Sequence, residues 1–176
     1  MKQFFEGNEG TIFGSYIGGE FKLAEVVIFP ADEDSGEPPT ISFLLTIPGG
    51  SETVSETIVD GELPNCDGCW ADNLQQLKLD GEENSDLLYS VNEALRPLVA
   101  GTALDRELLL WEAERLRCSV EYQGNLIFDQ PWLLKSDLFS TSCGSLHQVQ
   151  YELKLLAKAQ LKRRSKLKKK ANSKAL

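Results

Sequence analysis

The residues from Thr11 to Pro30 form one continuous β-prone segment, and this segment limits the folds that the chain can adopt. It reads TIFGSYIGGEFKLAEVVIFP and consists largely of aromatic and β-branched residues, the types enriched in strands. Gly18 and Gly19 interrupt it, and adjacent glycines inside a strand predict a bulge or a sharp bend. A long strand bent in its middle can pair in both halves of a curved sheet, so the segment favours a β-rich fold.

Two more strands are expected before the first helix. Residues 40–48 read TISFLLTIP, and a turn at Pro48-Gly49-Gly50-Ser51 leads into a third strand over 52–59. Apolar residues then recur at helical spacing from Ser85, which we expect to cap a helix that Pro97 ends or kinks.

The second half of the chain predicts a helix, a hairpin and a final helix. The helix covers 105–115, and the hairpin joins 116–123 to 126–134 through Gly124-Asn125. Ser145 and Gln148 form a capping box at the start of the last helix. Its apolar stripe is made by Leu146, Val149, Leu153 and Leu156.

The element order is therefore β–β–β–α–β–β, which is the order of an OB-fold, a five-stranded Greek-key barrel. We predict a β-rich α+β protein with an OB-like barrel and a C-terminal amphipathic, basic helix. The alternative is an open antiparallel sheet with helices on one side. The predicted domains are an acidic barrel over 9–139 and a basic helix and tail over 145–176.

Three stretches, GTIFGSYIGG, PPTISFLLTIPGG and RCSVEYQGNLIFDQ, carry a resemblance to a known group of proteins. With their order they make residues 9–135 resemble the small OB-fold single-stranded DNA-binding proteins of phages and mobile elements. The resemblance implies a barrel that binds single strands on a face with aromatic residues. Well-known bacterial members carry an acidic tail, whereas this chain ends in a basic one.

The charge is divided unevenly along the chain. Residues 145–176 contain ten Lys or Arg and one acid, whereas residues 1–144 contain eight bases and 26 acids. Such asymmetry is typical of a globular body with a tail for nucleic acid or for an acidic partner. We therefore predict a non-enzymatic accessory protein that binds nucleic acid, most simply single-stranded DNA. The predicted phosphate contacts are Lys162, Arg163, Arg164, Lys166, Lys168, Lys169 and Lys170, followed by Lys22, Arg117 and Lys135 on the expected strands.

A second interpretation is a protein-interaction or assembly module. The apolar stripe of the last helix would dock on a partner helix, and the basic end would lie on the acidic body of a partner or of another subunit. For the tail itself, the alternative is a lysine-rich end that only keeps the chain soluble.

The four cysteines and the single His147 leave few routes to metal or catalytic chemistry. Cys66 and Cys69 have the spacing of half a zinc site, but Cys118 and Cys143 are 25 residues apart rather than a second close pair. No phosphate-binding loop, nucleophile elbow or HExxH motif occurs. We expect no metal site, no cofactor and no catalytic residue. The absence of a signal sequence and of a long apolar run predicts a cytoplasmic protein without a membrane role.

Overall fold

A computed structural model describes residues 3–4, 10–63, 79–124 and 130–175 of the chain. These residues form two compact units. The first comprises residues 1–32 and 38–103, and the second comprises residues 33–37 and 104–176. The sequence placed its boundary between 139 and 145, whereas the contacts divide the chain between Ala103 and Leu104. The reason is that the last strands share one apolar core with the final helix.

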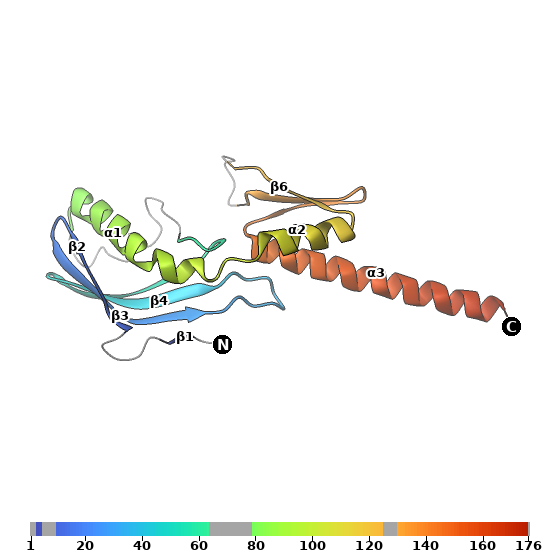
Figure 1. The fold of residues 1–176 in the computed structure, drawn as a ribbon, viewed down its shortest axis with the longest axis horizontal. Helices are drawn as coiled ribbons and strands as arrows, with labels where there is room; N and C mark the ends of the chain where they lie inside the picture. The colour runs from blue at the N-terminus through green and yellow to red at the C-terminus, as the bar shows by residue number, and fades with distance from the viewer. Residues whose placement is uncertain (1–2, 5–9, 64–78, 125–129, 176) are drawn as a thin grey trace. The chain divides into compact units, whose positions relative to one another are not determined.

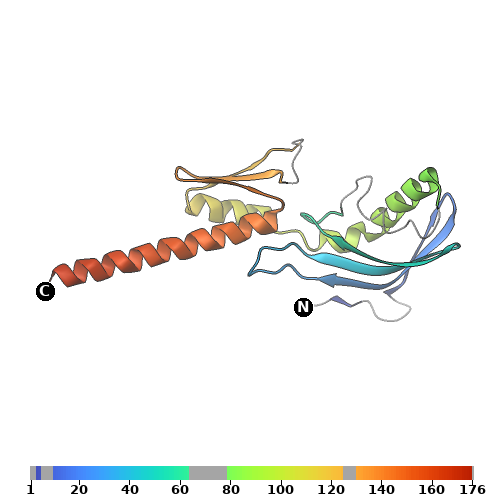
Figure 2. The same cartoon turned by 180° about the vertical axis from the view of Figure 1, so that it is seen from behind.

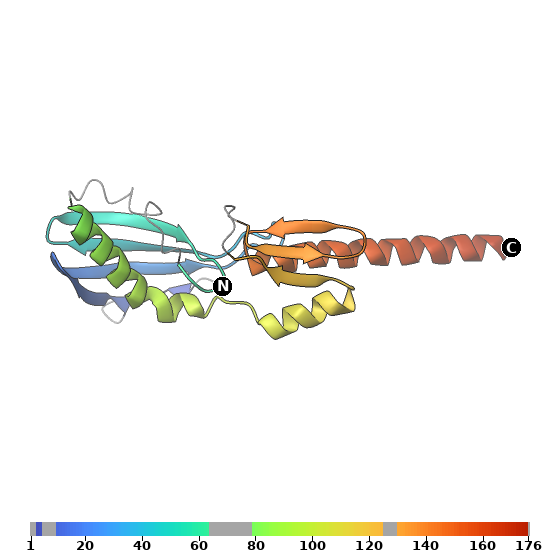
Figure 3. The same ribbon diagram turned by 90° about the horizontal axis from the view of Figure 1, so that it is seen from above.

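The first unit is an antiparallel sheet covered by one helix. Its strands are β1 (Gln3–Phe4), β2 (Ile12–Tyr16), β3 (Gly19–Phe29), β4 (Thr40–Ile47) and β5 (Gly50–Thr57). The order is β1-β3-β4-β5, with β2 also paired to β3. The helix α1 (Gly81–Ala100) runs diagonally across one face of the sheet (Figure 3).

The core of this unit follows from the two-residue periodicity of its strands and the periodicity of about 3.6 residues of α1. Alternate residues of β3 and β4, such as Leu23, Phe43 and Leu45, are buried under α1. Leu87, Val91 and Leu95 recur every four residues along α1 and meet them. The opposite face of β4 and β5 presents mostly Ser and Thr side chains.

The second unit is built on a smaller sheet with the order β6-β7-β8. Its strands are β6 (Ser119–Tyr122), β7 (Trp132–Lys135) and β8 (Ser140–Cys143). The helices α2 (Arg106–Arg115) and α3 (Leu146–Lys174) lie on one face of this sheet (Figures 1 and 2). Leu109 of α2, Leu134 of β7 and Leu153 of α3 are buried together in its core.

The α+β class and the C-terminal helix are confirmed. The described strands form two open antiparallel sheets and do not close into a barrel. The barrel prediction required Gly18 and Gly19 to bend one long strand, and they do not. Tyr16 pairs with Gly19, so Ile17 and Gly18 form a tight turn, and residues 11–30 make a hairpin instead of one bent strand. Gly19 has a φ of 143°, which favours glycine, and the irregularity of β3 lies instead between Ala24 and Val27.

Three local predictions also differ from the structure. Asp80 caps α1 in place of Ser85, since its side chain accepts a hydrogen bond of 2.8 Å from the Glu83 amide. Pro97 lies in the last turn of α1, which continues to Ala100. Tyr122 pairs with Trp132, a register that a two-residue turn at Gly124-Asn125 does not allow; residues 125–129 lie outside the described residues.

The start of α3 agrees with its prediction. Ser145 Oγ accepts a hydrogen bond from the Gln148 amide at 3.2 Å. The Gln148 side chain in turn accepts one from the Gly144 amide at 2.7 Å. The first bond satisfies a backbone donor that the first turn of a helix leaves free, and the second ties the residue before the cap to the same turn, so together they fix where α3 begins. Within the described ranges, no helix has the length and hydropathy that a membrane span requires.

Candidate nucleic-acid interface

The helix α3 changes character along its length. Leu146, Val149 and Leu153 are buried against α2 and the small sheet. From Lys158 to Ala175 every residue except Gln160 is exposed. This outer half of α3, Lys158 to Lys174, spans about 25 Å at a rise of about 1.5 Å per residue. It extends past α2 and the strands of its own unit (Figure 1).

The outer half contains nine bases and no acid. At about 100° per residue, seven of them fall within an arc of about 160° around the helix. The other two are Arg164 and Lys168. The arc is formed by Lys158, Lys162, Arg163, Lys166, Lys169, Lys170 and Lys174. One side of a 25 Å helix is therefore continuously cationic.

The bases of the outer half have no acidic partners among the described residues. Ion pairs within the described part of the chain join Arg96 to Glu93 at 2.6 Å and Lys154 to Glu33 at 3.2 Å. Lys154 precedes the outer half and pairs with the β3–β4 connection, whose Gly36 packs against Tyr151 of α3. The positive charge of the outer half is consequently available to an external anion.

Arg117 and Lys135 come together, but in acidic surroundings. Both line a shallow hollow of about 360 Å³ on the second unit. Its wall also includes three acids, Glu114, Glu121 and Asp137. The three carboxylates repel a phosphate, which is also negatively charged. Arg117 and Lys135 are therefore a weaker anion site than the outer half of α3.

Lys22 lies apart from the other predicted contacts. It is exposed on β3 in the first unit, between Phe13 on β2 and Thr46 on β4. That unit has four bases and 16 acids, a net charge of −12, whereas the second unit has 14 bases and 11 acids, a net charge of +3. Among the aromatic residues on the strands, Phe13 and Tyr122 are largely exposed, while Phe21, Phe43 and Trp132 are buried.

The cysteines give no support to a zinc site within the described residues. Cys66 and Cys69 lie outside them, so their prediction stays a prediction. Cys118 and Cys143 are free thiols in the core of the second unit. Burial raises the pKa of both, that of Cys143 to about 11 with a further contribution from Glu152, so both are protonated thiols at neutral pH in the metal-free protein. The described residues contain no group of three potential metal ligands.

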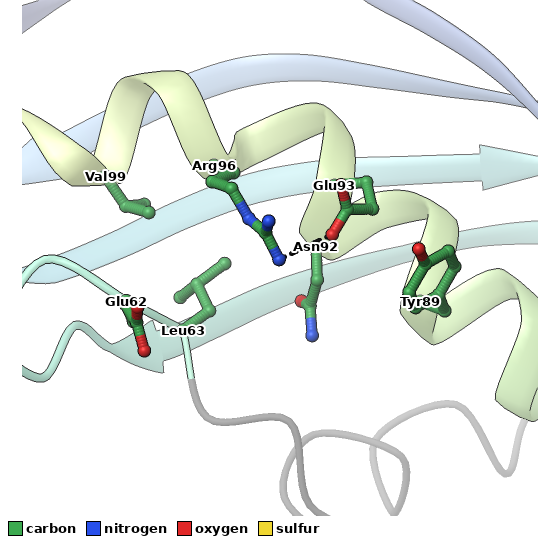
Figure 4. A pocket seen from close by; sticks show the side chains of 7 residues that line it. All are labelled: Glu62, Leu63, Tyr89, Asn92, Glu93, Arg96 and Val99. Carbon is green, nitrogen blue, oxygen red and sulfur yellow. Dashed lines mark ion pairs between the residues drawn. The ribbon is translucent and has the colours of Figure 1, made fainter.

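A second hollow, on the first unit, has a different chemistry. It has a volume of about 300 Å³ and is lined by α1 together with Glu62 and Leu63 (Figure 4). Arg96 is the cation in its wall and is already paired to Glu93. The side-chain amide of Asn92 is buried here and has no hydrogen-bond partner among the described residues. With one paired cation and two acids, this hollow does not favour a phosphate.

Sequence reasoning missed a third hollow, which lies between the end of α2 and the middle of α3. It has a volume of about 320 Å³, and its wall contains two arginines, Arg115 and Arg164, with no acid. Gln160, Leu116, Ala157 and Leu161 complete the wall. The guanidinium carbon of Arg115 lies 5.3 Å from the ring centroid of Trp111.

The sequence contained one signal for this hollow. Trp111 and Leu108 have the hydrophobicity of core residues, but α2 buries Leu109 and Ala113 and leaves the other two exposed. Trp111 and Arg115 are four residues apart and so share a face of α2. No protein-family model, no curated protein and no solved structure matches this chain.

Proposed function

We propose that this protein binds nucleic acid through the outer half of α3. The observation that carries the proposal is the exposed helical stretch of nine bases with no acid and no ion pair to a described residue. A polyanion with regularly spaced charges is the natural partner of such a surface, because each neutralised phosphate releases counterions. An α-helix also fits the major groove of a duplex.

Repulsion within α3 supports the same function. Within the outer half, five pairs of bases are spaced four residues apart, namely 158/162, 162/166, 164/168, 166/170 and 170/174. Like charges at this spacing each destabilise a helix by about 0.2–0.5 kcal/mol. A phosphate backbone relieves this repulsion, so part of the binding free energy comes from the helix itself.

Docking on a partner helix is less well supported. The exposed leucines of α3 are Leu155, Leu161 and Leu167. They are six residues apart, so successive leucines point about 120° away from one another and form no stripe. A partner helix needs apolar residues three and four positions apart on one face.

A second candidate function is self-association. The observation that favours it is the net charge of −12 on the first unit, which matches the cationic outer half of α3 on another copy. This interaction and nucleic-acid binding both weaken with salt, so salt dependence alone does not separate them.

The test compares the intact chain with a variant that ends after Ala157. The variant keeps the buried turns of α3 and loses the nine bases. Fluorescence anisotropy with labelled duplex and single-stranded DNA should show binding by the intact chain. If about half of the bases contact phosphates, we expect log–log salt slopes of about −4 for duplex and about −3 for single strands.

The truncated variant should lose this binding while its thermal unfolding stays unchanged. Light scattering without nucleic acid tests the second candidate. A salt-sensitive oligomer that dissociates in the truncated variant, combined with no DNA binding at low salt, would assign the outer half to self-association.

A further inference from the structure

We infer that the hollow between α2 and α3 binds one unpaired nucleotide of a single strand, with Arg115 and Arg164 on its phosphate and Trp111 stacked on its base. This inference rests on the proposed nucleic-acid binding and adds a preference for single strands to it. We call the three residues the nucleotide clamp.

The position of Arg164 separates the clamp from the cationic arc. Arg164 follows Val149, Leu153 and Gln160 at spacings of four, seven and four residues, so all four share the side of α3 that packs in the second unit. Val149 and Leu153 are buried in that core. Arg164 continues the same side beyond them and therefore lines the hollow with Arg115, away from the arc.

The chemistry of the hollow selects a phosphate. Two guanidinium groups and an amide side chain, that of Gln160, line it, and no acid does. Arginine presents a planar set of donors that binds phosphate oxygens in pairs, and two of them can hold one phosphate from two sides. The hollow of Arg117 and Lys135 lacks this property because three acids share its wall.

The neighbouring aromatic residue selects an unpaired base. Trp111 is 56% exposed, although it is among the largest side chains of the unit. Its ring contacts the Arg115 guanidinium at 5.3 Å, so the indole and the phosphate-binding group form one surface. Bases of single strands stack on such rings, at about 1–3 kcal/mol per base, whereas the bases of a duplex are already stacked. Leu108, one turn earlier on the same face of α2, extends the apolar area.

The experiment uses the full chain and two labelled probes, an oligothymidylate of about 20 nucleotides and a duplex of matched length. Trp111→Ala should lower affinity for the oligothymidylate about 10-fold and leave the duplex affinity unchanged. Trp111→Phe should retain most of the affinity, because the phenyl ring also stacks. Trp111 is exposed, so neither change should alter thermal unfolding.

A matched pair of double variants isolates the two arginines. Arg115→Gln with Arg164→Gln and Lys162→Gln with Lys166→Gln each remove two charges. We expect the arginine double variant to reduce the preference for the oligothymidylate over the duplex. The lysine double variant should lower the affinity for both probes by similar factors. Equal effects of the two pairs, with Trp111→Ala unchanged, would overturn the clamp.

The two proposals fail in different ways. If the intact chain binds neither probe at low salt, the proposed function fails and the clamp fails with it. If the intact chain binds both probes equally and Trp111→Ala changes nothing, only the clamp is wrong. Loss of a self-associated form in the clamp variants, in place of single-strand affinity, would assign the surface to a second copy and overturn the clamp as well.

Discussion

The two halves of α3 are one continuous helix, yet different forces hold them. The first half begins at the Ser145 cap and buries Leu146, Val149 and Leu153 in a core. The outer half is exposed from Lys158 onward and carries nine bases. Tertiary packing therefore fixes the first half, whereas the outer half is helical because it extends a formed helix with residues of good helix propensity.

This difference shows how one helix can combine an anchor with an interaction surface. Forming a first turn is the unfavourable step in making a helix, and the capped, buried half completes that step. Each further residue then adds a hydrogen bond at little cost, so a cationic stretch that repels itself still becomes helical. The bases are thereby held on one side of a rod instead of being distributed over a flexible tail.

The largest expected effect is the difference in stability between two leucine substitutions, one in each half of α3. Leu153→Ala should destabilise the second unit by about 2–5 kcal/mol, because Leu153 is 2% exposed in the core. Leu167→Ala should change stability by less than about 0.5 kcal/mol, because Leu167 is 67% exposed. Chemical denaturation measures both. Equal effects would mean that the outer half packs on something in solution, and would contradict the division of α3.

The next effect separates helix stability from binding in the outer half. Lys162→Glu with Lys170→Glu converts the four like-charge pairs along 158, 162, 166, 170 and 174 into opposite-charge pairs. The helicity of the outer half should rise, because opposite charges four residues apart stabilise a helix. DNA affinity should nevertheless fall about 100-fold at about 0.1 M salt, where each phosphate contact contributes roughly a factor of ten.

The control for this variant makes the same change of net charge in the first unit. Lys22→Glu with Arg96→Glu lowers the net charge equally but lies in the first unit. Circular dichroism and anisotropy should show neither effect in the control. A comparable loss of DNA affinity there would locate part of the binding in the first unit, against the proposal.

The pH dependence of stability tests the core beneath the first half of α3. The pKa of Cys143 is raised from 9.0 to about 11, first by burial and then by Glu152 of α3. The thiol of the unfolded chain ionises at lower pH than that of the folded chain. The stability from the protonated thiol is therefore complete below about pH 9 and is lost as pH rises toward about 11. Urea unfolding at several pH values should show a larger loss in the natural chain than in Cys143→Ala, which keeps only the contribution of the buried Cys118 thiol.

The smallest expected effect concerns the cap that starts α3. Ser145→Ala removes the acceptor for the Gln148 amide and should destabilise the second unit by about 1 kcal/mol. Ser165→Ala, at an exposed site in the outer half, is the matched control and should be neutral or slightly stabilising. Thermal unfolding compares the two. A larger effect at Ser165 would show that the outer half is more than an extension of the first.

Local features of the chain could be predicted because they depend on neighbours in sequence. The capping box at Ser145, the apolar stripe through Val149 and Leu153, and the basic stretch from Lys162 each follow from spacing along one helix. The strand over residues 40–48 agrees with β4 for the same reason, since its residues alternate between two faces.

The sheets and the clamp residues were decided by contacts between distant segments. Gly18 and Gly19 are compatible with a bent strand or with a tight turn, and only the pairing of Tyr16 with Gly19 selects the hairpin. Trp111 has the hydrophobicity of a core residue, but α2 turns Leu109 and Ala113 inward instead. Arg115 and Arg164 are 49 positions apart and line one hollow only because α2 and α3 pack together. The sequence alone determined the cationic helix, because its charges are local; the tertiary structure decided which side of it faces α2.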